Sequence, residues 1–274
     1  FRYRPGTPER TDARRGRIPC RHDDVEARPM NRLRKWLPGV GLSLFSLSAL
    51  CASVVTVHQP GKTWSAEPAD TLSRLVTQPQ LNNVWWQGAV IATPSATLRA
   101  QQTQQQVLAS LSVWQNRTDD ERIATIRAVA AQIRSLRIVG RQFVSLDPDA
   151  VRTDARGDRF LEGRYDLWLS PAPRTVTLMG AVVTPGKRAW RPGASIRDYL
   201  QGQLRLAGAD RNNVTVIDPD GSTVVAPVAY WNARHIEAEP GAVLWVGFDP
   251  RAVPDDFTGL NEQIVALLTR RIPD

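Results

Sequence analysis

The sequence predicts an α+β protein that is built from two similar modules and ends in an amphipathic helix. Two observations support this prediction: a short motif that occurs twice, and apolar residues that recur at helical spacing in two other places. The chain has 274 residues, of which 42% are hydrophobic and 23% are charged, as in globular proteins. This length accommodates two ordinary domains and some additional segments.

The repeated motif opens each module. Residues 54–64 read VVTVHQPGKTW, and residues 182–190 read VVTPGKRAW. A β-branched run, a Pro-Gly turn, a lysine and a tryptophan are typical of a strand, a turn and a second strand. A short helix is expected after each motif, beginning at Asp70 and at Ser195. A strand–turn–strand–helix unit is the opening of a β-grasp-like domain.

Further strand patterns indicate that the two β-grasp-like domains cover residues 54–172 and 173–250. In the second domain, strands are expected at residues 214–217, 223–230 and 242–248, separated by Asp-, Pro- and Gly-containing turns. In the first domain, strands are expected at residues 82–93, 143–147 and 165–169. Trp85 and Trp86 would then point to opposite faces of one strand.

A helical hairpin is expected as an insertion in the first domain, over residues 97–139. Its first arm reaches Gln115 and contains a very polar turn at residues 101–106. Thr118 and Glu121 form a capping-box pattern at the start of the second arm, and Gly140 is placed as its C-cap. The second arm carries one apolar face, made of Ile123, Ile126, Ala130, Ile133 and Leu136.

The C-terminal amphipathic helix is expected over residues 256–271. Its apolar stripe consists of Phe257, Leu260, Ile264, Leu267 and Leu268. The stripe either packs on the chain's own domain or binds a partner. We expect the first arrangement, because a bare apolar stripe would promote aggregation.

A secretory signal peptide is predicted at residues 30–53. Arg32, Arg34 and Lys35 precede an apolar run that ends in small residues near Cys51. A lipoprotein site at Cys51 and an uncleaved membrane anchor are the alternatives to ordinary cleavage. Residues 1–29 are rich in arginine and proline, and we interpret them as an extension outside the working protein.

Charge and cysteine content exclude several classes of function. Residues 1–53 hold 11 of the 35 basic and 5 of the 27 acidic residues, so the remaining 221 carry a net charge of only +2. A nucleic-acid partner is therefore not expected. Both cysteines, Cys20 and Cys51, precede residue 54, which leaves the two modules without a thiolate nucleophile, disulfide or cysteine metal site.

The sequence also lacks the common catalytic and metal-binding patterns. His58 and His235 show no metal-binding spacing, and the chain has neither a nucleophile-elbow nor a P-loop motif. His235 could act as a base beside Glu237 and Glu239, or lie in a solvated loop. No catalytic residue, metal ligand or cofactor is predicted. The eight tryptophans from Trp64 onward suit sugar rings and protein interfaces alike.

Four long segments resemble one family. They are TLSRLVTQPQLNNVWWQGA, VSLDPDAVR, RLAGADRNNVTVIDPDGSTVVAPVAYWNARHIE and LNEQIVALLTRRIPD. Their order and sequence are similar to the GfcC/YjbG family of periplasmic proteins of capsule and exopolysaccharide biosynthesis. The resemblance implies two β-grasp domains like those of outer-membrane polysaccharide export proteins, a helical insertion and a C-terminal helix. It also implies a small pocket with an arginine, for which Arg141, Arg152 and Arg164 are the candidates.

Two hypotheses about function follow. The first is a non-enzymatic periplasmic accessory protein, monomeric or weakly oligomeric. It would bind either export or assembly proteins of the cell envelope or an acidic polysaccharide, whose carboxylates suit arginine. The second is a periplasmic enzyme that modifies or cleaves polysaccharide. The absence of a catalytic pattern favours the first, and we expect Arg141 to matter more for function than for folding.

Overall fold

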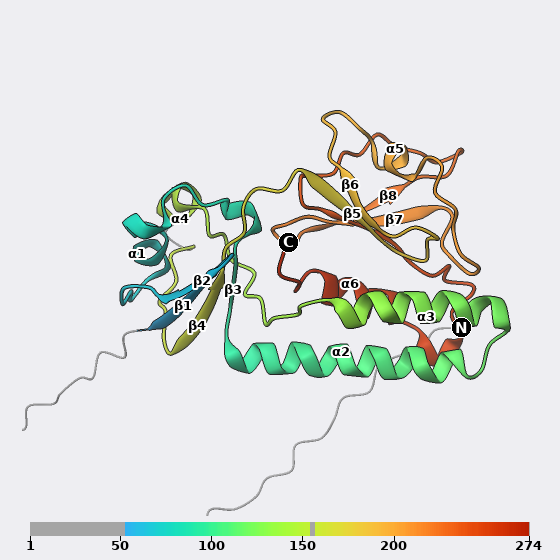
Figure 1. Cartoon of the computed structure of the whole chain (residues 1–274), viewed down its shortest axis with the longest axis horizontal. Helices are drawn as coiled ribbons and strands as arrows, with labels where there is room; N and C mark the ends of the chain where they lie inside the picture. The colour runs from blue at the N-terminus through green and yellow to red at the C-terminus, as the bar shows by residue number, and fades with distance from the viewer. Residues whose placement is uncertain (1–52, 154–156, 274) are drawn as a thin grey trace, which may run out of the picture. The chain divides into compact units, whose positions relative to one another are not determined.

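The computed structural model describes residues 53–153 and 157–273, and these residues confirm the α+β class. They form a four-stranded and a five-stranded mixed sheet with helices packed around them (Figure 1). None of the helices in this part of the chain is long and apolar enough to cross a membrane. The predicted extension, the signal peptide up to residue 52 and both cysteines lie outside the described residues.

The first sheet has the strand order β2-β1-β4-β3. Its strands are β1 (Val54–Gln59), β2 (Lys62–Ser65), β3 (Val90–Ala92) and β4 (Arg164–Trp168). The β1–β2 hairpin turns at Gly61, whose positive φ of 74° favours glycine. β1 is antiparallel to β2 but parallel to β4, and Val57 pairs with Trp64 on one side and with Leu167 on the other.

Short helices cover this sheet and close a small core. They are α1 (Leu72–Val76), α4 (Pro148–Thr153) and the 3-10 turns η1 (Pro79–Leu81) and η2 (Trp86–Gly88). α1 contacts α4, and Leu75 and Val151 are buried with Val57 and Leu167 in one apolar cluster. The predicted strand over residues 82–93 is therefore mostly wrong: only its last third pairs with β4, because η2 turns the chain before it.

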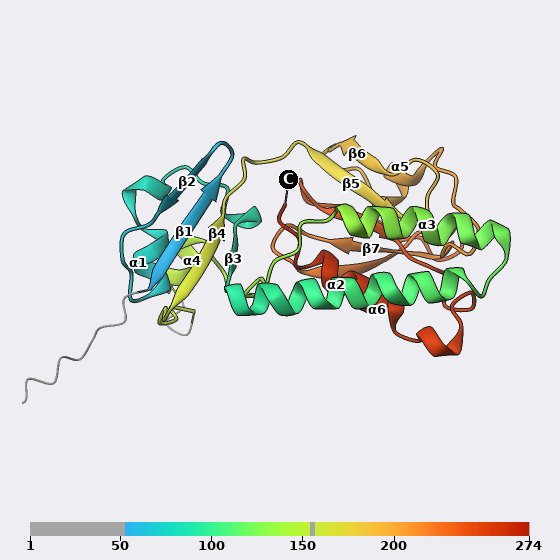
Figure 2. The same ribbon diagram turned by 60° about the horizontal axis from the view of Figure 1, so that its bottom comes forward.

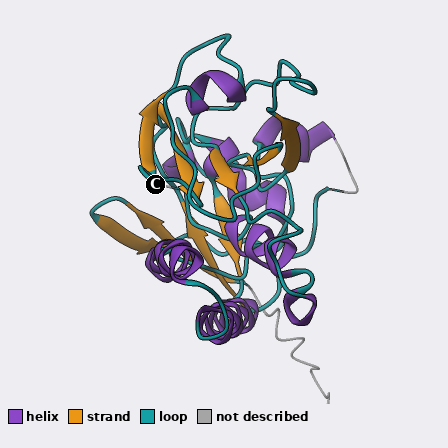
Figure 3. Ribbon diagram, turned by 90° about the vertical axis from the view of Figure 1, so that its right-hand side faces the viewer, coloured by secondary structure: helices purple, strands orange, loops and turns teal. Residues whose placement is uncertain are grey.

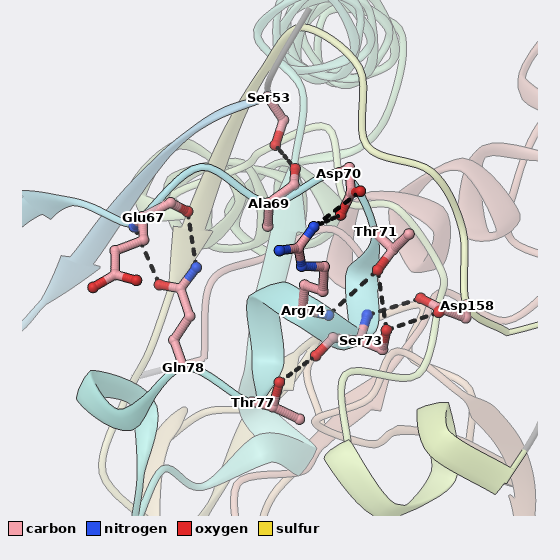
Figure 4. Close-up of polar contacts among 10 residues, drawn as sticks. All are labelled: Ser53, Glu67, Ala69, Asp70, Thr71, Ser73, Arg74, Thr77, Gln78 and Asp158. Carbon is pink, nitrogen blue, oxygen red and sulfur yellow. Dashed lines mark hydrogen bonds and ion pairs between the residues drawn. The ribbon is translucent and has the colours of Figure 1, made fainter. Parts of the chain in front are cut away.

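A polar network fixes the start of α1 (Figure 4). The Asp158 carboxylate accepts hydrogen bonds from the Ser73 amide at 2.8 Å and from the Ser73 hydroxyl at 2.7 Å. Thr71 is the N-cap and accepts from the Arg74 amide, whereas the side chain of Asp70 forms an exposed ion pair with Arg74. A loop distant in sequence thus supplies acceptors for helical amides that have no partner inside the helix.

The second sheet repeats the order of the first and adds one edge strand, giving β6-β5-β9-β7-β8. Its strands are β5 (Thr175–Gly180), β6 (Gly186–Ala189), β7 (Asn213–Ile217), β8 (Thr223–Pro227) and β9 (Val243–Val246). As in the first sheet, the hairpin strand β5 is parallel to the last strand, β9. The short helix α5 (Ile196–Leu200) follows the β5–β6 hairpin and begins with a capping box between Ser195 and Asp198.

The predicted helical hairpin consists of α2 (Pro94–Gln115) and α3 (Asp120–Ser135). The two helices lie side by side in Figures 1 and 2, and Figure 3 shows them end-on. The predicted turn at residues 101–106 is wrong, because α2 continues through it. Glutamine is a good helix former, and the buried Gln104 amide donates to the carbonyls of Ile133 and Leu136 at 2.8 and 3.2 Å. It thereby satisfies carbonyls at the C-terminal end of α3.

Two predicted caps of this hairpin are also wrong. α3 is capped by Asp119, whose carboxylate accepts from the Arg122 amide, and not by Thr118. α3 ends at Ser135, five residues before Gly140. Gly140 instead lies against the first turn of α2, where a Cβ atom would fall 2.2 Å from the Ala96 carbonyl carbon. Its absence of a side chain is required by this close backbone approach and not by a helix end.

The terminal helix α6 (Leu260–Leu268) is shorter than predicted, because the 3-10 turn η3 (Asp255–Phe257) and Gly259, with a φ of 86°, separate residues 255–258 from it. Leu260, Ile264, Leu267 and Leu268 are all buried. They belong to one cluster with α2, α3 and the second sheet, and α6 contacts α2 and β7. The apolar stripe is thus covered within the chain, as expected.

Replacing Ile264 with alanine should lower the free energy of unfolding by about 2–5 kcal/mol. Ile264 is 0% exposed, so the substitution leaves a cavity in the larger core. Glu262→Ala, on the exposed face of the same helix, is the matched control and should change it by less than about 0.5 kcal/mol. Urea unfolding measures both, and equal stability of the two variants would contradict the burial of α6.

Replacing Asp158 with alanine should destabilise the first module by about 1–2 kcal/mol, because the amide and hydroxyl of Ser73 lose their acceptor. Asp70→Ala removes only an exposed ion pair and should leave the unfolding midpoint unchanged. Thermal unfolding of the two variants makes the comparison. A larger effect at Asp70 than at Asp158 would show that the network does not fix α1.

Candidate functional site

A pocket with a volume of about 750 Å³ is formed by loops of both modules. Three stretches of chain line it: residues 84–89 around η2, residues 141–150 before and in α4, and residues 220–222 in the β7–β8 turn. The predicted strand at residues 143–147 is wrong, since this stretch forms the pocket wall as an irregular loop. Arg141, one of the three predicted arginines, belongs to this lining.

Arg141 is positioned by the edge of the first sheet. It forms an isolated antiparallel bridge with Ala92 of β3, and the amide of Gln142 donates to the Ile91 carbonyl at 2.8 Å. The amide of Gly140 donates to the Thr97 hydroxyl at the start of α2. The backbone on both sides of Arg141 is therefore held by β3 and α2, which directs its side chain toward the second module.

The guanidinium of Arg141 lies at the C-terminal end of α6. It donates to the carbonyl of Thr269, the C-cap residue, at 3.4 Å. This is a favourable place for a cation, because the helix dipole concentrates negative charge there. The side chain is only 7% exposed, and burial lowers its pKa to about 10, opposed by the nearby charge of Asp220. Arg141 consequently stays charged at neutral pH.

Aromatic rings form part of the pocket wall. Phe143 is 53% exposed, and the guanidinium carbons of Arg141 and Arg270 each lie 5.9 Å from its ring centroid. Such distances allow cation–π attraction. Trp85 lies across Gly88, where a Cβ atom would fall 1.9 Å from the indole ring. The rings therefore provide apolar faces next to a buried cation.

Gly221 brings the second module close to Arg141. It has a φ of 90°, and a Cβ atom there would lie 2.9 Å from the Phe143 ring and 3.4 Å from the Arg141 guanidinium carbon. Next to it, Asp220 accepts a hydrogen bond from the Ser222 amide at 2.8 Å. On the opposite wall, Asp147 accepts from the Asp149 amide at the same distance. Both carboxylates thus serve their own turns.

The arrangement suits recognition of a polar ring that carries a negative charge. Arg141 offers a cation, Trp85 and Phe143 offer apolar faces, and Ser145 and Ser222 offer exposed hydroxyls. A desolvated arginine pairs strongly with carboxylate, and aromatic faces pack against the C–H faces of sugars. These are the chemical groups that an acidic sugar residue requires.

The other two predicted arginines do not join Arg141. Arg152 is exposed on α4, where it pairs with Asp149 and donates to the Pro148 carbonyl. Arg164 is exposed at the start of β4. Neither residue lines the pocket of Arg141.

His58 and His235 also lie outside the pocket of Arg141. His58 is 2.8 Å from an Asp166 oxygen and stacks on Trp168 with centroids 5.0 Å apart, whereas His235 forms an exposed pair with Glu237. Within the described residues, no group of His, Cys, Asp or Glu side chains is arranged to hold a metal ion.

The sequence pattern did not single out Gly221, Asp220 or Trp85 as pocket residues. The Asp-Pro-Asp-Gly turn signal correctly predicted a hairpin between β7 and β8. Its proximity to Arg141 depends on how the two modules pack, which a local pattern does not encode.

A buried carboxyl in this turn should make stability depend on pH. Burial raises the pKa of Asp218 to about 6, and the charges of Glu239 and Asp220 raise it further. Because the folded state holds this proton more tightly than the unfolded state, the protonated carboxyl contributes its full stabilisation below about pH 4. This contribution is lost as the pH rises through about 6. Asp218→Asn should therefore unfold at a higher temperature than the wild type at pH 7.5 but not at pH 4. Asp255→Asn, an exposed control, should show no such difference, and a pH-independent effect at Asp218 would contradict the assignment.

Comparison with known proteins identifies the family of this chain. A family model described as "Capsule biosynthesis GfcC, N-terminal" matches residues 51–172, and one described as "Capsule biosynthesis GfcC C-terminal" matches residues 184–273. The chain is also 42% identical over 234 residues to a protein of Escherichia coli (strain K12) described as "Uncharacterized protein YjbG". That alignment covers 85% of this chain and 96% of the relative. The chain therefore belongs to the GfcC family of capsule biosynthesis proteins.

Proposed function

We propose that this protein is a non-enzymatic periplasmic accessory of capsule or exopolysaccharide biosynthesis, which binds an acidic polysaccharide during assembly or export. The binding site is the pocket of Arg141. The membership in a capsule biosynthesis family supports the process, and the chemistry of the pocket supports the ligand. The predicted signal peptide supports the periplasmic location.

The observation that carries the proposal is the environment of Arg141. Arg141 is only 7% exposed yet lines a pocket of about 750 Å³, and the acceptor of its guanidinium among the described residues, the Thr269 carbonyl, is neutral. No carboxylate in the described residues lies within ion-pair distance of it, so its charge is left for a ligand. A uronic-acid carboxylate would supply the missing negative charge and two acceptor oxygens.

The neighbouring groups favour binding over catalysis. The pocket contains two carboxylates, Asp147 and Asp220, which could in principle serve a hydrolase as acid and base. Each accepts a hydrogen bond from a backbone amide in its own turn, and both residues are exposed, which favours a role in loop structure over a role as a catalytic pair. An enzyme that modifies or cleaves the polysaccharide remains the second candidate because these two carboxylates share the pocket.

Replacing Arg141 with methionine should weaken binding of the host's purified acidic polysaccharide by about tenfold or more, since a charge-assisted hydrogen bond is lost. Polymer output should fall in cells that carry only this variant. Because Arg141 is buried, the substitution should also lower the free energy of unfolding by about 1–2 kcal/mol. The sequence alone led us to expect an effect mainly on function, and the burial adds this effect on stability. Arg141→Lys keeps the charge without the planar fork and should fall between wild type and Arg141→Met.

Arg152→Gln is the matched control, because Arg152 is exposed and outside the pocket. This variant should bind the polysaccharide and restore polymer output in cells as the wild type does. Normal polymer binding by Arg141→Met would contradict the proposed site. New reducing ends after incubation of the polysaccharide with the wild-type protein, lost in Asp147→Asn or Asp220→Asn, would establish the enzymatic alternative instead.

A further inference from the structure

A second pocket, of about 450 Å³, lies in the second module. We call it the guanidinium pocket, because Arg197, Arg205 and Arg211 line it. It shares no lining residue with the pocket of Arg141. The remaining lining is formed by amide and apolar side chains, with no acidic residue among them.

Three separate stretches of the chain bring these arginines together. Arg197 lies in α5, and Arg211 lies two residues before β7. Arg205 is held between them by an isolated antiparallel bridge to Val182, the residue that opens the second repeated motif. Like charges gathered at one place from different elements repel one another, so their convergence needs a compensating interaction.

Within the described residues this compensation is partial and comes from the charge of Asp210, which favours the charged form of Arg205. None of the three guanidinium groups takes part in a hydrogen bond or ion pair there. Some surface arginines are paired, for example Arg117 with Asp256 at 3.1 Å, and others, such as Arg164 and Arg234, are not paired within the part of the chain that the structure describes. What distinguishes these three is that they line one pocket together. Arg205 is half-buried, and burial lowers its pKa, with Asp210 opposing and Arg211 reinforcing the shift. Arg197 and Arg211 are exposed, so Arg205 is the arginine of this pocket that is most withdrawn from water.

The nearest acidic residues along the chain are engaged with the backbone. Asp198, next to Arg197, accepts from the Ser195 amide at 2.8 Å and from the Ser195 hydroxyl at 2.7 Å. Asp210, next to Arg211, accepts from the Asn212 amide at 2.7 Å. Both carboxylates cap local structure, and neither forms an ion pair with an arginine of the pocket. The charge of Asp210 therefore balances the three guanidinium charges only in part.

We propose that the guanidinium pocket binds a phosphate or diphosphate group. Guanidinium forks match the geometry of phosphoryl oxygens, and three permanent charges suit an anion that carries more than one negative charge. A single carboxylate would leave most of this charge unbalanced. Leu204, 71% exposed in the lining, and its neighbour Val183, 51% exposed, offer an apolar surface for the group that bears the phosphate.

Calorimetric titration of the full chain with inorganic phosphate and with pyrophosphate tests the proposal. The variant Arg197→Gln/Arg205→Gln/Arg211→Gln should bind pyrophosphate at least tenfold more weakly than the wild type. Arg205→Lys, which keeps the charge, should bind several-fold more weakly. Residues 1–53 carry a net charge of +6, so only differences between proteins count. An equal affinity in the wild type and the triple variant would overturn the site.

Two control variants separate this site from net charge and from the proposed function. Arg234 is exposed and outside both pockets, so Arg234→Gln should leave pyrophosphate binding unchanged. Arg141→Met should also leave it unchanged, which makes the two proposals independent. A loss in Arg234→Gln equal to that in the triple variant would overturn the site, as would acetate binding as tightly as pyrophosphate.

Vesicles distinguish a lipid headgroup from a soluble phosphate. Phosphatidylcholine vesicles containing phosphatidylglycerol, which carries a phosphodiester, are compared with phosphatidylcholine alone. Binding to the anionic vesicles that is lost in the triple variant would support the site and identify a headgroup as the source. Pyrophosphate binding without such vesicle binding would support a soluble source. The absence of both, in a wild-type protein with an ordinary unfolding transition, would overturn the proposal.

Discussion

The apolar face of α6 packs into the core shared by α2, α3 and the second sheet, and the Arg141 pocket depends on this packing. Each of its four buried aliphatic side chains contributes about 1.5–3 kcal/mol relative to exposure to water. The same packing brings the C-terminal end of α6 next to residues 139–141, between α3 and α4. The Val139 amide donates to the Arg270 carbonyl, and the Thr269 carbonyl accepts from Arg141. Loss of α6 would thus open the core and remove the acceptor that orients Arg141.

Close backbone approach at two glycines completes that pocket. Gly140 fits against the first turn of α2, and Gly221 fits against Phe143 and Arg141. At either position a methyl group would overlap existing atoms, so neither Gly140, next to Arg141, nor Gly221, in the pocket wall, tolerates a side chain. The surroundings of Arg141 are therefore shaped by two close approaches, of Gly140 to the α2 backbone and of Gly221 to the Phe143 ring and the Arg141 guanidinium.

The two arginine sites differ in how their charge is balanced. Arg141 is buried and stabilised by a helix C-terminus, so a ligand with one carboxylate is sufficient. The guanidinium pocket concentrates three charges without any acceptor in the described residues, which suits a multiply charged phosphoryl group. The two proposals therefore assign different anions to the two sites, a sugar carboxylate to the first and a phosphoryl group to the second.

The local sequence by itself determined the α+β class, the strands β4 and β6 to β9, the α2–α3 hairpin and the amphipathic character of α6, but it missed β5 and placed the first strand of the β5–β6 hairpin at residue 182. Each of these depends on the alternation or helical spacing of neighbouring residues, which is a short-range property. Only the tertiary structure decided that the Gln104 amide bonds the end of α3, that Gly140 serves packing, and that Arg141 meets Gly221 while Arg152 and Arg164 do not. These outcomes depend on contacts between residues far apart in the chain, where burial and steric fit outweigh local preference.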